Sequence, residues 1–150
     1  MSPNNWGPSI WSLFHTLIEK LKEENYYKIH VELFSYIMQI CYTLPCPTCA
    51  SHAKQTLSSI NIHDLKTKSD FKNFLYVFHN KVSQRISKTL FKYEDLENYK
   101  SKNIILEFNK FAYSYTRNNN TALLADNFHR KQFVKKFKNW IMEKIKYFDM

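Results

Sequence analysis

The scarcity of glycine is the feature that most limits what this chain can fold into. Among 150 residues there is one glycine, Gly7, and the four prolines all precede residue 48. Folds made only of β-strands need many tight turns, and glycine-rich phosphate loops need unusual backbone angles that only glycine adopts at little cost. The composition therefore disfavours both kinds of structure and predicts an all-α protein.

Hydrophobic periodicity predicts a bundle in the first hundred residues. Apolar side chains recur at spacings of three and four over residues 9–22, 26–42 and 70–90. Pro47 suits the first position of another helix, expected to run to about residue 60, and a short fifth helix is expected at 93–100. Four such helices joined by short links are typical of an antiparallel four-helix bundle, assigned here to a domain of residues 1–100.

Residues 101–150 form a basic helical extension in this interpretation. They carry 10 Lys/Arg against 4 Asp/Glu, a net charge of +6, whereas residues 1–100 carry 12 against 9. Two more helices are expected here, separated by a linker at 117–122. In the last one, aromatic side chains follow one side, while most lysines and Arg130 follow the other. Such a helix can bind a membrane surface or nucleic acid, but we favour one that packs on the bundle by its aromatic side.

The sequence also indicates the kind of cellular compartment in which the protein works. No apolar run approaches the ~20 residues that span a bilayer, and the first residues lack the pattern of a secretory signal. Three cysteines are too few for a scaffold stapled by disulfides. We therefore expect no transmembrane segment, no secretion and a reducing compartment, in which a CxxC pair is reactive or metal-bound.

The segment LPCPTCASH, residues 44–52, carries the chemistry. Cys46 and Cys49 are expected in the first turn of the third helix, where the helix dipole favours the thiolate and brings the thiol pKa toward neutrality. This favours a redox pair. A structural zinc site is the alternative, because Cys41, Cys46, Cys49 and His52 offer three thiolates and an imidazole.

Two further segments join this motif in a recognisable order. WGPSIWSLFH at 6–15 gives WG-x3-W-x3-H, the cysteine segment gives PC-x2-C-x2-H, and residues 79–88 give HN-x-V-x5-K. Over roughly residues 4–100 this order resembles the flavin-dependent sulfhydryl oxidases of the ALR/Erv family. The resemblance implies an FAD-binding helical bundle, usually a homodimer, that oxidises dithiol proteins and passes the electrons to dioxygen, giving hydrogen peroxide. A flavin-free dithiol carrier remains a third option.

The resemblance also implies roles for individual residues. Cys46 would meet client thiols, and Cys49 would lie next to the flavin. Arg85 or Lys88 would neutralise the pyrophosphate. The full set implied to bind the cofactor is drawn from the motifs and their neighbours: Gly7, Trp11, His15, His52, Tyr76, His79, Asn80, Val82, Ser83, Arg85 and Lys88.

The chain departs from the family pattern at several positions. Tyr76 and Tyr93 stand where relatives commonly carry a second disulfide, and packing of the two rings is expected instead. Ser83 and Ser87 replace the usual asparagine and glycine. There is no second CxxC, so clients would be oxidised directly at Cys46, and Cys41 is expected to be buried and inert. Short viral relatives suggest the host cytoplasm or the virus particle as its location.

Overall fold

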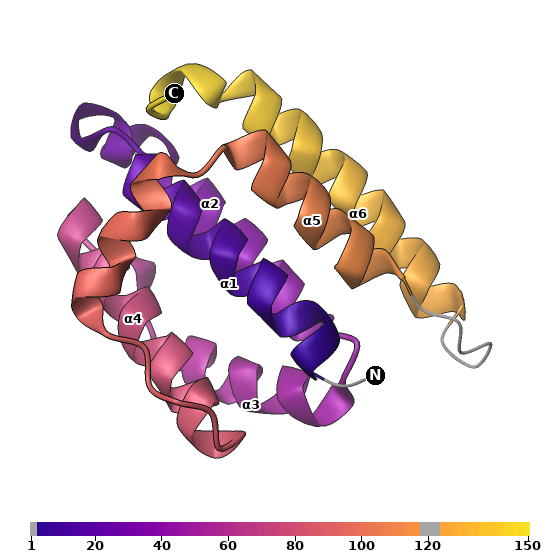
Figure 1. Ribbon diagram of the computed structural model, residues 1–150. Helices are drawn as coiled ribbons and strands as arrows, with labels where there is room; N and C mark the ends of the chain where they lie inside the picture. The colour runs from indigo at the N-terminus through magenta and orange to yellow at the C-terminus, as the bar shows by residue number, and fades with distance from the viewer. Residues whose placement is uncertain (1–2, 118–123) are drawn as a thin grey trace.

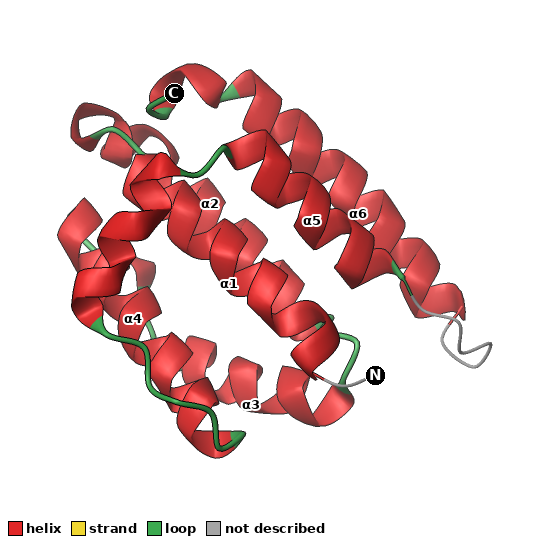
Figure 2. Cartoon of the chain, viewed as in Figure 1, coloured by secondary structure: helices red, strands yellow, loops and turns green. Residues whose placement is uncertain are grey.

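The protein is built from helices that surround one long central helix (Figures 1 and 2). The computed structural model describes residues 3–117 and 124–150, and no strand occurs within these ranges. Six α-helices and four short 3-10 helices follow in the order α1 (Pro3–Lys20), η1 (Glu23–Asn25), α2 (Tyr26–Tyr42), α3 (Pro47–Ser58), η2 (Ile62–Asp64), α4 (Lys68–Arg85), η3 (Tyr93–Ser101), α5 (Ile104–Thr116), α6 (Leu124–Glu143) and η5 (Ile145–Tyr147). The all-α fold class is confirmed.

Helix α1 is the central element of the core. It contacts α4 and η3 on one side and α5 on the other, and Leu13, Phe14 and Leu17 have no exposed surface. The predicted start at residue 9 is wrong, because the helix begins at Pro3 and Pro8 lies inside it. Proline suits the first helical turn, so Pro3 starts the helix. Pro8, the sixth residue of the helix, has no N–H and so removes one backbone hydrogen bond near that end.

Helix α4 begins and ends on clear local signals. The Thr67 hydroxyl accepts from Asp70 N–H at 3.1 Å and the Asp70 carboxylate accepts from Thr67 N–H at 3.1 Å, which is a capping box. The predicted end at residue 90 is wrong, because the helix stops at Arg85. Ser87 adopts a left-handed conformation with φ 59°, and Lys88 N–H donates to the Ser83 carbonyl at 2.8 Å.

Helices α5 and α6 lie side by side along α1 and α2 (Figure 1). Their apolar faces belong to the same hydrophobic core as the first hundred residues, with Phe108, Phe111 and Phe137 buried in it. The Trp140 indole donates to the Glu32 carboxylate of α2 at 2.7 Å. The aromatic side of α6 is therefore packed on the bundle. The linker expected at 117–122 lies, apart from Arg117, outside the described residues.

Lysines 131, 135, 136 and 138 of α6 are exposed, as the sequence predicted, but Arg130 is not. Only 4% of its surface is exposed. No described helix combines the length and apolar character needed to cross a membrane.

Candidate active site

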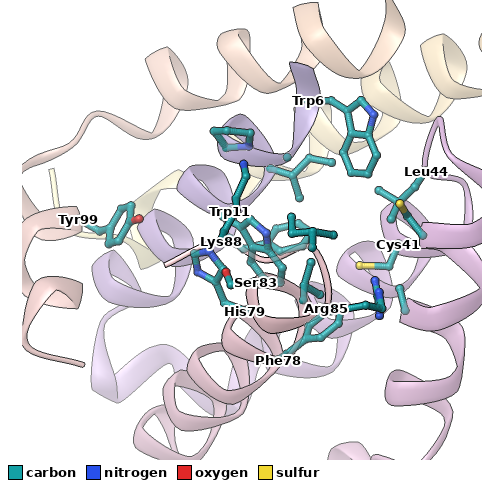
Figure 3. Close-up of a pocket in the computed structure, with 18 residues that line it drawn as sticks. Trp6, Trp11, Cys41, Leu44, Phe78, His79, Ser83, Arg85, Lys88 and Tyr99 are labelled. Atoms are coloured by element: carbon teal, nitrogen blue, oxygen red, sulfur yellow. The ribbon is translucent and has the colours of Figure 1, made fainter. Parts of the chain in front are cut away.

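Helices α1, α3 and α4 line a cavity of about 240 Å³, to which α2, the α2–α3 connection and η3 also contribute (Figure 3). Its wall is mainly apolar and aromatic, and no carboxylate of a described residue lines it. Eight of the residues that the sequence predicted to bind the cofactor or to act in catalysis line this cavity: Gly7, Trp11, Cys49, His79, Val82, Ser83, Arg85 and Lys88. Segments more than 70 residues apart in the chain therefore meet at one site.

The cysteine pair stands at the start of α3, as predicted. Cys46 is the N-cap residue with extended backbone angles, and Pro47 follows at the first helical position. The Cys46 sulfur accepts a hydrogen bond from Cys49 N–H at 3.3 Å. Both thiols are free and half-buried, and only Cys49 lines the cavity. The two sulfurs thus differ in position: one belongs to the cavity wall and the other to the helix end beside it.

The expected fall in thiol pKa does not hold for Cys49. Burial, reinforced by the hydrogen bond and charge of Cys46, raises the pKa of Cys49 to about 11. The positive charge of Arg85 and the backbone hydrogen bond to Cys49 oppose this rise without cancelling it. Removal of the thiolate from water therefore outweighs the helix N-terminus. In this reduced form, Cys49 carries its proton at neutral pH.

Aromatic rings are stacked in the wall of the cavity. Trp11 lies parallel to His79, with ring centroids 4.3 Å apart and 8° between their planes (Figure 3). Trp11 and His15 are four residues apart on α1 and so share one helix face. His15 has no exposed surface, and its Nε2 lies 2.9 Å from Nδ1 of His79.

Both histidines are uncharged at neutral pH. Burial, then the nearby His79 and Lys72, lower the pKa of His15 to about 3. Burial and the charge of Lys88 lower the pKa of His79 to about 4. One ring therefore donates and the other accepts in the hydrogen bond that joins them.

The remaining polar groups at the cavity are suited to an anionic or acceptor-bearing ligand. Arg85 and Lys88, both exposed, line it from the end of α4. Trp6 lines it too, and its indole N–H is buried without a partner among the described residues. Such a donor normally finds an acceptor, so the cavity offers an unused hydrogen bond to a ligand.

The zinc alternative finds no support. Among the side chains that the structure describes, no three of His, Cys, Asp or Glu are grouped so that they could hold a metal ion. Cys41 is buried in α2. Complete burial raises the pKa of the Cys41 thiol well above its ordinary value, which opposes the thiolate that zinc requires.

A family of known proteins matches nearly the whole stretch of chain that lines this cavity. The model of the Erv1 / Alr family matches residues 8–103, about two thirds of the chain. The chain belongs to the Erv1/Alr family. All three sequence motifs overlap or lie within the matched region.

Viral proteins are among its relatives. The FAD-linked sulfhydryl oxidase of African swine fever virus (a Kenyan pig isolate) is 27% identical over 71% of this chain and 90% of its own length. Protein 347L of Invertebrate iridescent virus 6, provisionally named a FAD-linked sulfhydryl oxidase, is 31% identical over 60% and 86%. A similarly named Fowlpox virus protein is 32% identical over 52% and 73%. No solved structure matches the chain significantly.

In this Erv1/Alr member, two tyrosine rings pack together where the resemblance implied a disulfide in relatives. Tyr76 and Tyr93 meet edge to face, with centroids 5.2 Å apart. The expected packing is confirmed, and Tyr76 does not line the cavity.

Four other residues implied by the Erv1/Alr resemblance also lie outside the cavity wall. Asn80 uses its amide to hold the returning chain, accepting from Phe91 N–H at 2.7 Å and donating to the Phe91 carbonyl at 3.0 Å. His15 lies behind His79. His52 lines a shallow polar depression that it shares with Arg85, and Cys46 adjoins the cavity from the helix end.

Several residues of the wall were not among those predicted from the sequence. Trp6 is itself the first residue of the WG motif but was not chosen as a site residue, and Phe78 immediately precedes the matched histidine, so the motifs pointed to both. Tyr99 of η3 could not, because it is far from every motif in sequence. Cys41 is buried, as expected, yet it lines the cavity.

Proposed function

We propose that this chain is an FAD-dependent thiol oxidase that forms disulfides in partner proteins through Cys46 and Cys49. The observation that carries the proposal is the convergence of the Cys49 sulfur with the first and third motifs on one aromatic cavity. The names of its relatives support FAD as the cofactor. The catalytic unit is residues 1–100, and the remaining helices extend it.

The residues present fit FAD. The apolar wall suits a flavin ring, and the unpartnered Trp6 indole N–H can donate to one of its acceptors. Trp11 and His79 offer aromatic faces, and Arg85 and Lys88 would hold the diphosphate. At about 240 Å³ the enclosed volume is below the usual ~300–1,000 Å³ of ligand pockets, so it suits only part of a dinucleotide. When bound, FAD would take two electrons from the dithiol and deliver them to dioxygen, giving hydrogen peroxide.

The protein's own residues divide the work between the two sulfurs. A client thiolate attacks the Cys46 sulfur of the oxidised pair, which breaks the Cys46–Cys49 bond and releases Cys49. A second client thiolate then displaces Cys46, leaving a client disulfide and a reduced pair that holds the two electrons. Cys49 must lose its proton before it can act as a nucleophile, and Arg85 is the cation that favours this loss.

The proposal also covers partners and location. Clients are proteins with two nearby thiols, and a homodimer is expected by analogy with the family. The relatives are viral, which favours the host cytoplasm or the virus particle. The packing of α6 on the bundle gives no support to a role for its aromatic side in membrane or nucleic-acid binding.

Absorption spectroscopy tests the proposal directly. The purified protein should be yellow, and anaerobic dithiothreitol should bleach it, because the electrons of the dithiol reach the flavin. Cys49→Ser should remain yellow but lose at least about 100-fold in oxygen uptake, since the cavity-side nucleophile is gone. A colourless protein, or a Cys49→Ser variant that takes up oxygen at the unmutated rate, would refute it.

A further inference from the structure

A second depression lies beside the redox pair, between the start of α3 and the first turns of α6. We call it the α3–α6 groove and define it by Leu44, Pro47, Lys54, His129, Arg130 and Phe133. Its volume is about 860 Å³. Leu44 and Pro47, which flank Cys46 in the sequence, line the groove, although Cys46 itself does not, so the groove adjoins the segment that carries the sulfur that clients must reach. The helix on its other side comes from the C-terminal extension.

Arg130 is the unusual residue of this groove. It is 4% exposed, and its one hydrogen bond among the described residues runs from a terminal nitrogen to the Thr43 carbonyl at 3.4 Å. Its Nε and its other terminal nitrogen are buried without a described partner. Buried donors left without acceptors are costly, above all on a charged group. A carboxylate is the acceptor that matches adjacent guanidinium donors best.

The rest of the groove has the same preference. Lys54 is exposed and lies over the Tyr42 ring, 5.8 Å from its centroid. Among the side chains that the structure describes, no Asp or Glu lines the groove. Tyr42, Pro47 and Phe133 add apolar surface, which an extended peptide can cover with its other side chains. Positive charge with an apolar floor complements an acidic segment rather than a basic one.

From these observations we propose that the α3–α6 groove docks client proteins by a segment in which acidic residues flank the cysteine presented to Cys46. The inference rests on the proposed function and names its substrate class. Docking precedes the exchange: the client thiolate forms a bond to the Cys46 sulfur as the Cys46–Cys49 bond breaks. The second client thiolate then displaces Cys46, so that two electrons pass to the pair as the client disulfide forms. Arg130 acts as a positioning residue, because it binds the client away from the reacting atoms.

Peptide binding tests the preference without any redox step. The probe is a fluorescein-labelled peptide in which serine replaces the reactive cysteine and glutamates stand on both sides. Fluorescence anisotropy measures its affinity for the full-length oxidised protein. The same measurement is made with a peptide in which lysines replace the glutamates. The glutamate peptide should bind at least about tenfold more tightly, and added salt should weaken its binding. Equal affinities for the two peptides would overturn the inference.

Matched variants locate the preference. Arg130→Met should weaken the glutamate peptide about tenfold, whereas Lys131→Met removes the same charge from an exposed neighbouring position and should not. Lys54 is exposed, so Lys54→Glu poses little risk to folding and should reverse the ranking of the two peptides. If Arg130→Met and Lys131→Met behave alike, or Lys54→Glu leaves the ranking unchanged, the groove does not select acidic clients.

Oxygen uptake with dithiothreitol separates this inference from the proposed function. The small dithiol reports the redox pair and has no carboxylate for the groove. If the protein takes up oxygen with dithiothreitol but binds both peptides equally, the inference about the groove is refuted and the proposed function is not. Absence of uptake combined with selective glutamate-peptide binding refutes the oxidase and leaves an acid-selective groove.

Discussion

His15 and His79 are held uncharged by their surroundings, and this has a cost at acid pH. Their hydrogen bond needs at least one neutral ring, and burial lowers the pKa of His15 to about 3 and that of His79 to about 4. In the unfolded chain each histidine has a pKa near ~6.5. The unfolded state therefore binds protons first as the pH falls. The neutral pair therefore stabilises the fold fully above the unfolded pKa, and this stabilisation is lost as the pH falls toward the two folded pKa values.

We predict that the free energy of unfolding falls steeply between about pH 6.5 and 4. Each histidine contributes a slope of up to ~1.4 kcal/mol per pH unit. Urea unfolding at several pH values measures this. His15→Phe should remove about half of the slope, whereas His63→Asn, at an exposed site, should leave it unchanged. A His15→Phe slope equal to that of the unmutated protein would contradict the prediction.

For single residues, the sequence predicted which residues meet at the site better than it predicted how buried they are. The motifs identified Cys49, Trp11 and His79, and the structure brings all three to one cavity. The pKa of Cys49 was predicted in the wrong direction because helix position was known from Pro47 and burial was not. Arg130 was placed on the solvent side because helical periodicity shows which residues share a face, but not what a neighbouring helix adds to that face.

Among the elements, the end of α4 carries local strain. Ser87 has φ 59°, the left-handed region in which a side chain costs roughly 1 kcal/mol relative to glycine. This residue stops the helix and directs Lys88 back toward the cavity. The family pattern has glycine here, and the need for it is visible in the backbone.

Ser87→Gly should therefore stabilise the protein by up to about 1 kcal/mol. The midpoint of urea unfolding measures the change. Ser59→Gly is the matched control: Ser59 also ends a helix and is exposed, but its φ is −83°. At that φ angle glycine relieves no strain, and it raises the conformational entropy of the unfolded chain, so the control variant should be neutral or slightly destabilised. The opposite order of the two variants would show that Ser87 is not strained.

The sequence predicted the bounds of some helices correctly and those of others wrongly. Helix α2 was predicted with its observed bounds, because its apolar spacing stops at a proline turn. The ends of α1 and α4 were missed, since Pro3 and Ser87 act through backbone geometry and not through hydrophobic pattern. The short fifth helix was found at the right place, although it is a 3-10 helix.

For the whole molecule, the extension completes the core. The Ser12 hydroxyl donates to the buried Glu107 carboxylate, and the Trp140 indole donates to Glu32. Phe108, Phe111 and Phe137 are buried against the bundle, although the sequence suggested a boundary at residue 100. Periodicity identified the aromatic face of the last helix correctly, but could not show how much of the core it would supply.

Deletion of residues 104–150 should consequently leave the first domain unable to fold as a soluble monomer. It uncovers a large apolar surface of α1 and α2, and such surfaces aggregate. Near-ultraviolet circular dichroism and gel filtration measure the loss of packing. As a control, Lys131, Lys135 and Lys138 are replaced together by glutamine, which removes charge and keeps the apolar face. A truncated chain that is monomeric and packed would show that the extension is dispensable for folding.

One contact of the extension reaches close to the reactive sulfurs. Thr43, three residues before Cys46, shares a hydrogen bond between its hydroxyl and that of Tyr115 in α5, and its carbonyl accepts from Arg130 in α6. Helices α5 and α6 thus both form a hydrogen bond with Thr43, in the loop that leads to the cysteines. A substitution near the carboxyl end of this polypeptide can therefore shift the redox loop without touching any signature residue.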